Sequence, residues 1–271
     1  MNDNHLPQCS NVSFSVLPFE IITAILGQLS QKDLLNLRKT NKEIREIIKI
    51  IRLPRLINLQ KNVDEQLEHI IKNYNFINFD LSYSDITDKG LRILNNHYCR
   101  YVNISGCYKV TDEGIKSLNN CHTVDLSGCN LVTDEGIKAL RNCHTVNLTK
   151  CKLVTDEGIK ALSNCHTVNL SHCYLVTDEG IKALSNCHTV NFSYCYLITD
   201  EGIKALSKCH SVYLSGCISV TDEGIMALRN CRIVDICCCY SLTNKGINAL
   251  KKCRNIVISS SRVLVSNSQR N

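Results

Sequence analysis

The sequence predicts an α/β repeat solenoid, with parallel strands on its concave face, preceded by a small all-α module of three helices. Two observations carry this prediction. Cysteines recur at an interval of 22 residues through most of the chain, whereas residues 14–52 show apolar residues at helical spacing without that interval. With 271 residues, 44% of them hydrophobic, the chain is long and apolar enough to bury a sizeable core.

The repeat is defined by two rows of cysteines, which together contain 15 of the 18 cysteines. The first row is Cys99, Cys121, Cys143, Cys165, Cys187, Cys209, Cys231 and Cys253, and the second is Cys107, Cys129, Cys151, Cys173, Cys195, Cys217 and Cys239. Only Cys9, Cys237 and Cys238 fall outside both rows. An internal repeat of this period is typical of stacked supersecondary units.

One unit, residues 165–186, shows the local structure that every unit should adopt. Val168 and Leu170 alternate with polar residues, which predicts a short strand with one buried face. Thr177 is suited to cap a helix, and the two acidic residues after it suit the positive end of the helix dipole. Gly180 follows them, where the lack of a side chain would let neighbouring units approach closely.

These motifs resemble leucine-rich repeats of the cysteine-containing subtype over residues 77–258. The strand half matches that subtype's L-x-x-L-x-L-x-x-C pattern as Cys165-x-x-Val168-x-Leu170-x-x-Cys173, and the helix half as Val176-Thr177-Asp178-x-Gly180-Ile181-x-x-Leu184. The units are shorter than is usual for the subtype, and Cys replaces Leu at the first position. The resemblance implies a horseshoe of about eight units.

Residues 14–52 resemble the F-box, whose pattern L-P-x-E-I-x-x-x-I-x-x-x-L is followed by D-L-L-x-L-R. The matching residues are Leu17, Pro18, Glu20, Ile21, Ile25, Leu29, Asp33, Leu34, Leu35, Leu37 and Arg38. The resemblance implies that this module binds the Skp adaptor of a cullin-RING ubiquitin ligase. The residues that it implies as adaptor-binding are Leu17, Pro18, Glu20, Ile21, Ile25, Leu29, Leu34, Leu35 and Leu37.

The predicted domain organisation has five parts. They are an amino-terminal tail (1–13), the F-box-like module (14–52), a linker or cap (53–76), about eight repeats (77–258) and a carboxyl-terminal tail (259–271). The segment from Cys253 onward predicts one last strand without its helix.

Differences among the units indicate where a target could bind. The positions flanking the second cysteine vary most, and the outward strand position also varies. The predicted target-binding residues are Asp125, Asn147, Lys150, Asn169, His172, Tyr174, Asn191, Tyr194, Tyr196 and Tyr213. Tyrosine provides a large contact area at a low entropy cost, which favours a protein ligand. Neutral drift at solvent-exposed positions is the alternative interpretation.

No catalytic, metal or cofactor site is expected. A uniform row of cysteines does not converge on one tetrahedral site, so buried thiols that act as small hydrophobic groups are the preferred interpretation. Histidines 122, 144, 166, 188 and 210 also recur at 22 residues, whereas a catalytic histidine needs one distinct environment. The run from Cys237 to Cys239 is the one place where metal binding or oxidation stays an alternative.

Charge and hydropathy narrow the choice of partners and compartment. The net charge of +6 is concentrated at residues 31–61 and 251–271, where the basic residues interleave with Ile and Leu without an aromatic stacking platform. We therefore expect a protein partner and no nucleic acid.

No apolar stretch is long enough to span a membrane, and the first residues lack the features of a signal peptide. The expected location is the cytosol or the nucleus.

Together these features predict a noncatalytic substrate receptor of a Skp–cullin–F-box ubiquitin ligase. Its box would bind the adaptor and the ligase core, and its concave face would bind an unidentified target protein. The main alternative is a binding scaffold outside any ligase, whose helices only cap the solenoid. An activity that depends on thiols or on a metal is a third hypothesis.

Overall fold

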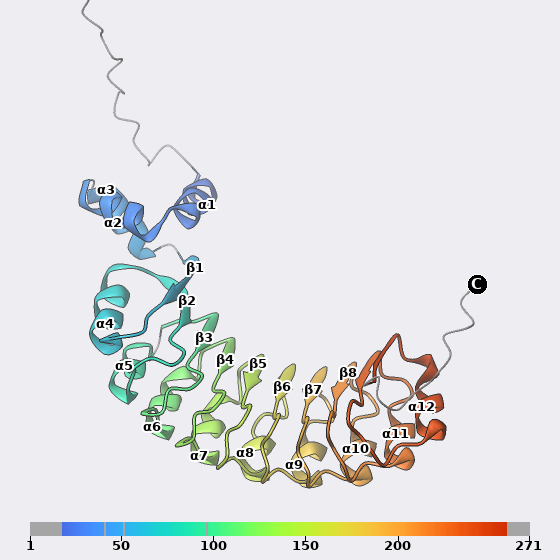
Figure 1. Ribbon diagram of the computed structural model, residues 1–271. Helices are drawn as coiled ribbons and strands as arrows, with labels where there is room; N and C mark the ends of the chain where they lie inside the picture. The colour runs from blue at the N-terminus through green and yellow to red at the C-terminus, as the bar shows by residue number, and fades with distance from the viewer. Residues whose placement is uncertain (1–17, 41, 51, 96, 259–271) are drawn as a thin grey trace, which may run out of the picture.

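The computed structural model describes residues 18–40, 42–50, 52–95 and 97–258. The chain forms an arc in which the strands line the inner side and short helices form the outer side, while α1, α2 and α3 lie over its amino-terminal end (Figure 1). An α/β solenoid with a preceding helical module was predicted, and both are present.

The helical module contains α1 (Phe19–Gln28), α2 (Gln31–Thr40) and α3 (Lys42–Ile50). Pro18 directly precedes α1, where its fixed φ favours a helix start and its missing N–H would have no partner. Ser30 precedes α2 and its hydroxyl accepts a hydrogen bond from the backbone N–H of Asp33 at 3.1 Å. This bond is a side-chain cap at the start of the helix.

One sheet of ten parallel strands runs through the described residues in chain order, from β1 to β10. Its strands are β1 (Leu53–Asn58), β2 (Phe76–Asp80), β3 (Tyr101–Asn103), β4 (Thr123–Asp125), β5 (Thr145–Asn147), β6 (Thr167–Asn169), β7 (Thr189–Asn191), β8 (Ser211–Tyr213), β9 (Ile233–Asp235) and β10 (Asn255–Val257). From β3 to β10 each residue pairs with the residue 22 positions later, so the sequence repeat sets the sheet register.

A short helix follows each strand except the last within the described chain. These helices are α4 (Val63–Asn73), α5 (Asp88–Ile93), α6 (Asp112–Ile115), α7 (Asp134–Ile137), α8 (Asp156–Lys160), α9 (Asp178–Ala183), α10 (Asp200–Ala205), α11 (Asp222–Ala227) and α12 (Asn244–Ala249), with 3-10 turns η2 (Lys116–Leu118), η3 (Lys138–Leu140) and η4 (Leu250–Lys252). The described chain has eight strand–helix units from β2 to α12, and β10 follows them as a further strand.

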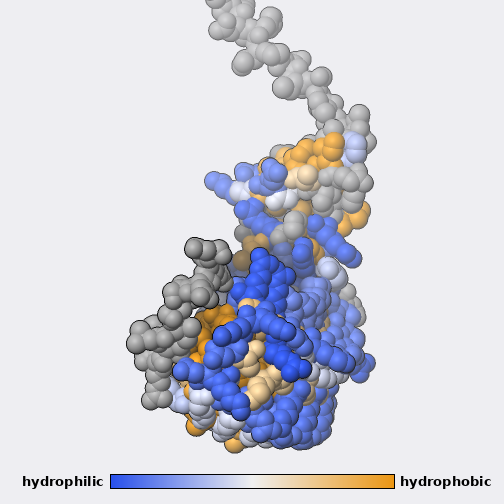
Figure 2. All heavy atoms as spheres, turned by 90° about the vertical axis from the view of Figure 1, so that its right-hand side faces the viewer, coloured by the Kyte–Doolittle hydropathy of each residue, from blue (hydrophilic) through white to orange (hydrophobic). Residues whose placement is uncertain are grey.

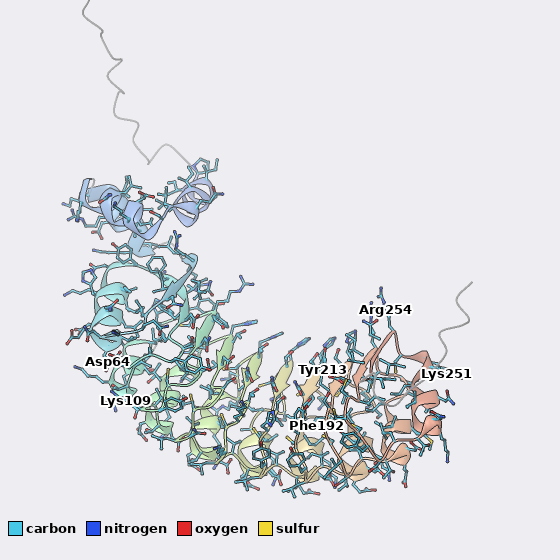
Figure 3. The ribbon with its side chains drawn as sticks, in the orientation of Figure 1. Asp64, Lys109, Phe192, Tyr213, Lys251 and Arg254 are labelled. Atoms are coloured by element: carbon cyan, nitrogen blue, oxygen red, sulfur yellow. The ribbon has the colours of Figure 1, made fainter. Side chains whose placement is uncertain are left out.

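The core lies between the sheet and the helices. In the unit around β6, Val168 and Leu170 point inward and are fully buried, as the alternation predicts. Phe192 occupies this layer in the next unit, whereas Tyr213 lies on the inner, concave side (Figure 3). A single unit cannot bury both of its faces, so neighbouring units stabilise one another.

A row of aspartates joins the units on the helical side. Asp156 accepts hydrogen bonds from the N–H of Thr177 at 2.8 Å and from its hydroxyl at 2.6 Å. Thr177 in turn caps α9 by accepting from the N–H of Glu179 at 3.3 Å. A Cβ on Gly180 would lie 2.5 Å from Asp156 Oδ1, too close for an alanine to fit without a shift. The predicted close approach at this glycine is therefore confirmed, and the aspartate explains it.

The segment expected as a linker or cap, residues 53–76, contains β1 and α4 and begins the sheet. Asp64 in α4 accepts hydrogen bonds from the N–H of Thr87 at 3.0 Å and from its hydroxyl at 2.5 Å. Asp156 accepts the same two bonds from Thr177. Gln66 stands where later units have glycine. In the described chain no earlier strand–helix unit places an aspartate over Gln66, so a side chain fits there.

Candidate adaptor-binding and target-binding surfaces

Helix α1 presents two apolar faces, about 100° apart around its axis. Ile22 and Leu26 are buried in the module, at 4% and 1% exposure. Ile21 and Ile25, one turn apart, are 47% and 40% exposed. Hydrophobic residues gather on the surface of the upper, helical part of the molecule (Figure 2). An exposed apolar pair on a helix whose other face is already packed is suited to a protein partner.

The other predicted adaptor-binding residues are placed differently. Pro18 is exposed beside the exposed pair on α1, and Leu29 and Leu37 are half-buried against the core. Leu34 is only 1% exposed, so it supports the fold of the module and has almost no surface to offer a partner. Leu17 and the side chains of Glu20 and Leu35 lie outside the part of the chain that the structure describes.

The helical module is attached to β1 and to the short segment that precedes β2. A guanidinium nitrogen of Arg55 in β1 donates to the carbonyl oxygen of Leu29, and the side-chain amide of Asn75 donates to the carbonyl oxygen of Ile50 at 3.0 Å. These bonds leave the exposed pair on α1 uncovered.

The outward asparagines of the strands have a structural role that the sequence analysis did not anticipate. Asn169 Oδ1 accepts from the N–H of Ser171 at 3.0 Å and from its hydroxyl at 2.7 Å. Asn147, Asn191 and Asp125 make the same turn in their units. These polar side chains therefore define where each strand ends. Their predicted contact with a target stays a prediction.

Five histidines form a continuous stack beside the strands. The rings of His122, His144, His166, His188 and His210 follow one another at centroid distances of 4.3–4.5 Å with interplanar angles of 13–16°. Burial, and then the neighbouring imidazoles, lower the pKa of His144 and of His188. Each ring also approaches the hydroxyl of the next residue at 2.8–3.1 Å. The equivalence of these rings indicates a structural row.

The position before each second cysteine has a left-handed backbone. Gly106, Gly128 and Gly216 have φ of 68–73°, and Lys150, His172 and Tyr194 adopt φ of 60–62° at the same position. For a residue other than glycine this conformation costs about 1–2 kcal/mol. Strained residues of this kind concentrate at functional sites.

Four of the predicted target-binding residues form two stacked pairs. The ring of His172 lies 4.6 Å from that of Tyr194, and the rings of Tyr174 and Tyr196 lie 5.7 Å apart. His172 Nδ1 also approaches the hydroxyl of Tyr174 at 3.1 Å. A Cβ at Gly216 would lie 2.5 Å from the Tyr194 ring, so a side chain in the unit that follows would have to displace this ring.

The second cysteine row holds the loops together. Each thiol donates to a carbonyl oxygen of the preceding unit at 3.0–3.4 Å, as Cys173 does to Leu148. Burial raises the pKa of the Cys151, Cys173 and Cys195 thiols to about 12. The thiols therefore act as small buried donors, in agreement with the preferred interpretation of the cysteine repeat.

Comparison with known families identifies both parts of the chain. Residues 14–56 match the F-box domain family, and residues 122–140, 144–163, 166–185 and 188–207 match the leucine-rich repeat family. The chain is an F-box protein with leucine-rich repeats. In this F-box protein the exposed pair on α1 belongs to the box, and the stacked His and Tyr residues belong to the repeats.

Solved structures show the same fold. A chain in the crystal structure of the Rad7 and Elc1 complex in yeast has a TM-score of 0.51 at 15% identity, covering 92% of this chain and 89% of that one. A chain of the TLR13–ssRNA13 complex has a TM-score of 0.58 at 12% identity, covering 79% of this chain and 33% of that one. A comparison with curated protein sequences found no match.

The described residues offer neither a membrane-spanning helix nor a cluster of metal ligands. None of their helices is both long enough and apolar enough to cross a membrane. No three of their His, Cys, Asp or Glu side chains are arranged to hold a metal ion, and Cys237, Cys238 and Cys239 all have free thiols.

Proposed function

We propose that this F-box protein is the substrate-recognition subunit of a Skp–cullin–F-box ubiquitin ligase. The box binds the Skp adaptor, and through it the cullin core, while the repeats hold the target protein. The observation that carries the proposal is the exposed pair Ile21 and Ile25, on a helix within the F-box match whose other face is already buried. The likeness over most of both chains to a structure solved as a complex, Rad7 with Elc1, supports a role within an assembly.

In this proposal the chain performs no catalysis, and it works in the cytosol or the nucleus. Its stacked histidines and its buried cysteines occupy equivalent positions in successive units. A catalytic group would instead need one distinct environment with its own partners. Ubiquitin transfer is therefore assigned to other subunits.

Capture of purified Skp adaptor by the full chain tests the box. The double substitution Ile21→Glu/Ile25→Glu removes half-exposed apolar area and places two charges in the contact, so we expect a loss of about 2–3 kcal/mol. That corresponds to about 30- to 150-fold weaker binding. The matched control is Leu175→Glu/Leu197→Glu, which changes two leucines of 47% and 51% exposure in the repeats. The control should bind the adaptor as the unchanged chain does.

The attachment of the module to β1 favours a second candidate, in which the helices only cap the solenoid. In that case the folded full chain captures no adaptor, and Ile21→Glu/Ile25→Glu behaves like the control. The chain is then a protein-binding scaffold outside the ligase.

A further inference from the structure

The exposed apolar residues of the repeats concentrate on one edge of the solenoid. The loops that leave the carboxyl ends of the parallel strands all lie at this edge, which we call the carboxyl edge. Its leucine row consists of Leu131, Leu153, Leu175 and Leu197, which are 46–51% exposed in four consecutive units. A second row, which we call the tyrosine row, lies one sequence position before the leucine row. It consists of Tyr174, Tyr196 and Ile218, which are 43–50% exposed.

The concave face offers a different surface. Its outward strand positions are mostly Asn, Asp and Thr, and Asn147, Asn169 and Asn191 use their side-chain oxygens in the turns that end the strands. A protein target that needs apolar contacts finds them at the carboxyl edge. Contiguous exposed apolar patches of this kind usually mark interaction sites.

Some side chains at the carboxyl edge are carried by a backbone in the strained left-handed conformation. The left-handed position holds glycine in three units, Tyr83 and Cys238 in the first and last of the eight units, and Lys150, His172 and Tyr194 in three further units. These three residues lie in consecutive units and adjoin the leucine row. Side chains retained in a strained conformation favour a role in binding.

Two exposed lysines lie at this edge. Lys150 and Lys152 are exposed at the amino-terminal end of the tyrosine row, and in the described part of the chain neither forms an ion pair. The lysines of the outer helices behave differently: Lys138, Lys160 and Lys182 each pair with a glutamate three residues earlier. The edge lysines therefore complement acidic groups on a partner.

The spacing of the side chains favours a helical partner. Stacked rings in consecutive units repeat at 4.6 Å for His172 and Tyr194 and at 5.7 Å for Tyr174 and Tyr196. The pitch of an α-helix, about 5.4 Å, falls within this interval. Side chains on one face of an extended strand repeat at about 6.6–6.8 Å, which falls outside it.

We propose that the carboxyl edge binds an acidic amphipathic helix of the target protein. Its apolar residues contact the leucine row and the tyrosine row, and its carboxylates pair with Lys150 and Lys152. This inference rests on the proposed function, because it specifies the surface by which the receptor holds its target.

A peptide selection tests the inference even though the target protein is unidentified. The full chain is used to select from a displayed library of random peptides of about 16 residues, long enough for a helix of about 24 Å. We expect enriched peptides with apolar residues at helical spacing and an excess of Asp and Glu. Enrichment of basic or non-periodic peptides, or no enrichment at all, would overturn the proposal.

Variants then locate the contact of the best enriched peptide, measured by fluorescence anisotropy. Lys150→Glu/Lys152→Glu and Leu175→Ser/Leu197→Ser should each weaken binding at least about tenfold. The matched control, Arg141→Glu/Lys208→Glu, makes the same charge change at exposed positions between helix and strand, on the opposite edge, and should change nothing. Equal binding by all of these variants contradicts the proposal, as does a dimer of the chain that the leucine substitutions abolish.

Adaptor capture by the same variants keeps the two proposals separate. The edge variants should retain adaptor binding, and Ile21→Glu/Ile25→Glu should retain peptide binding. Failure of the edge variants to affect peptide binding overturns the carboxyl-edge proposal alone. Failure of adaptor capture overturns the ligase role alone.

Discussion

Gly180→Ala tests the physical reason for the glycine repeat. In an ordinary helix this substitution is stabilising by about 1 kcal/mol, because alanine has the higher helix propensity. Here the new Cβ would lie 2.5 Å from Asp156 Oδ1, so the carboxylate that holds Thr177 through two hydrogen bonds must move. Two hydrogen bonds to a charged group together contribute about 3–6 kcal/mol, and we assign about half of this sum, about 1.5–3 kcal/mol, to the half-exposed Asp156. Subtracting the gain in helix propensity of about 1 kcal/mol leaves an expected net loss of about 0.5–2 kcal/mol.

The assay is urea unfolding followed by circular dichroism, in two backgrounds. In the Asp156→Ala background the carboxylate is absent, and Gly180→Ala should become neutral or stabilising by up to about 1 kcal/mol. The effect of the substitution on the free energy of unfolding thus changes from destabilising to neutral or stabilising between the backgrounds. An equal effect in both, or stabilisation in the unchanged background, would refute the role of the aspartate row.

Three further predictions concern side chains of the repeats. A small alkylating reagent should modify Cys237 and Cys238, which are half-buried, before any cysteine of the two buried rows; peptide mass spectrometry showing early modification of a buried row would contradict this. Lys150→Gly should stabilise the protein by about 0.5–1 kcal/mol because it relieves a positive φ of 62°, and a lower Tm would count against the strain argument. His144 and His188 have folded-state pKa values lowered by burial and by their neighbours, so their contribution to stability is present above the unfolded pKa and is lost as the pH falls below it. The Tm should therefore fall between about pH 7 and pH 5, and less so in a His144→Gln/His188→Gln variant.

Much of the fold follows from the sequence because each repeat specifies its own local structure. The alternation around Val168 and the cap at Thr177 predict a strand and a helix start that the structure confirms. The strand at Leu53–Asn58 was not predicted, since it carries none of the cysteines that reveal the period. The sequence signal for this first unit lies in the helix that follows the strand. There the acidic pair before Leu67 matches the acidic pairs at the later helix starts.

The candidate sites were predictable only in part, because exposure depends on how units stack. The sequence indicates the variable Lys, His and Tyr residues but gives no reason to separate Leu175 from the buried Val176 beside it. The row of exposed leucines therefore became visible only in the structure. In the same way, the helical pattern of the box does not by itself distinguish the buried Leu34 from the exposed Ile21.

Hydrogen exchange of the full chain with and without the Skp adaptor tests the central claim most directly. The claim is that the box and the carboxyl edge are separate binding surfaces of one receptor. We predict that the adaptor slows exchange in the helical module, residues 19–50, and leaves the loops that carry Tyr174 and Leu175 unchanged. Unchanged exchange throughout the module of a folded chain, or protection confined to the repeats, would contradict the account.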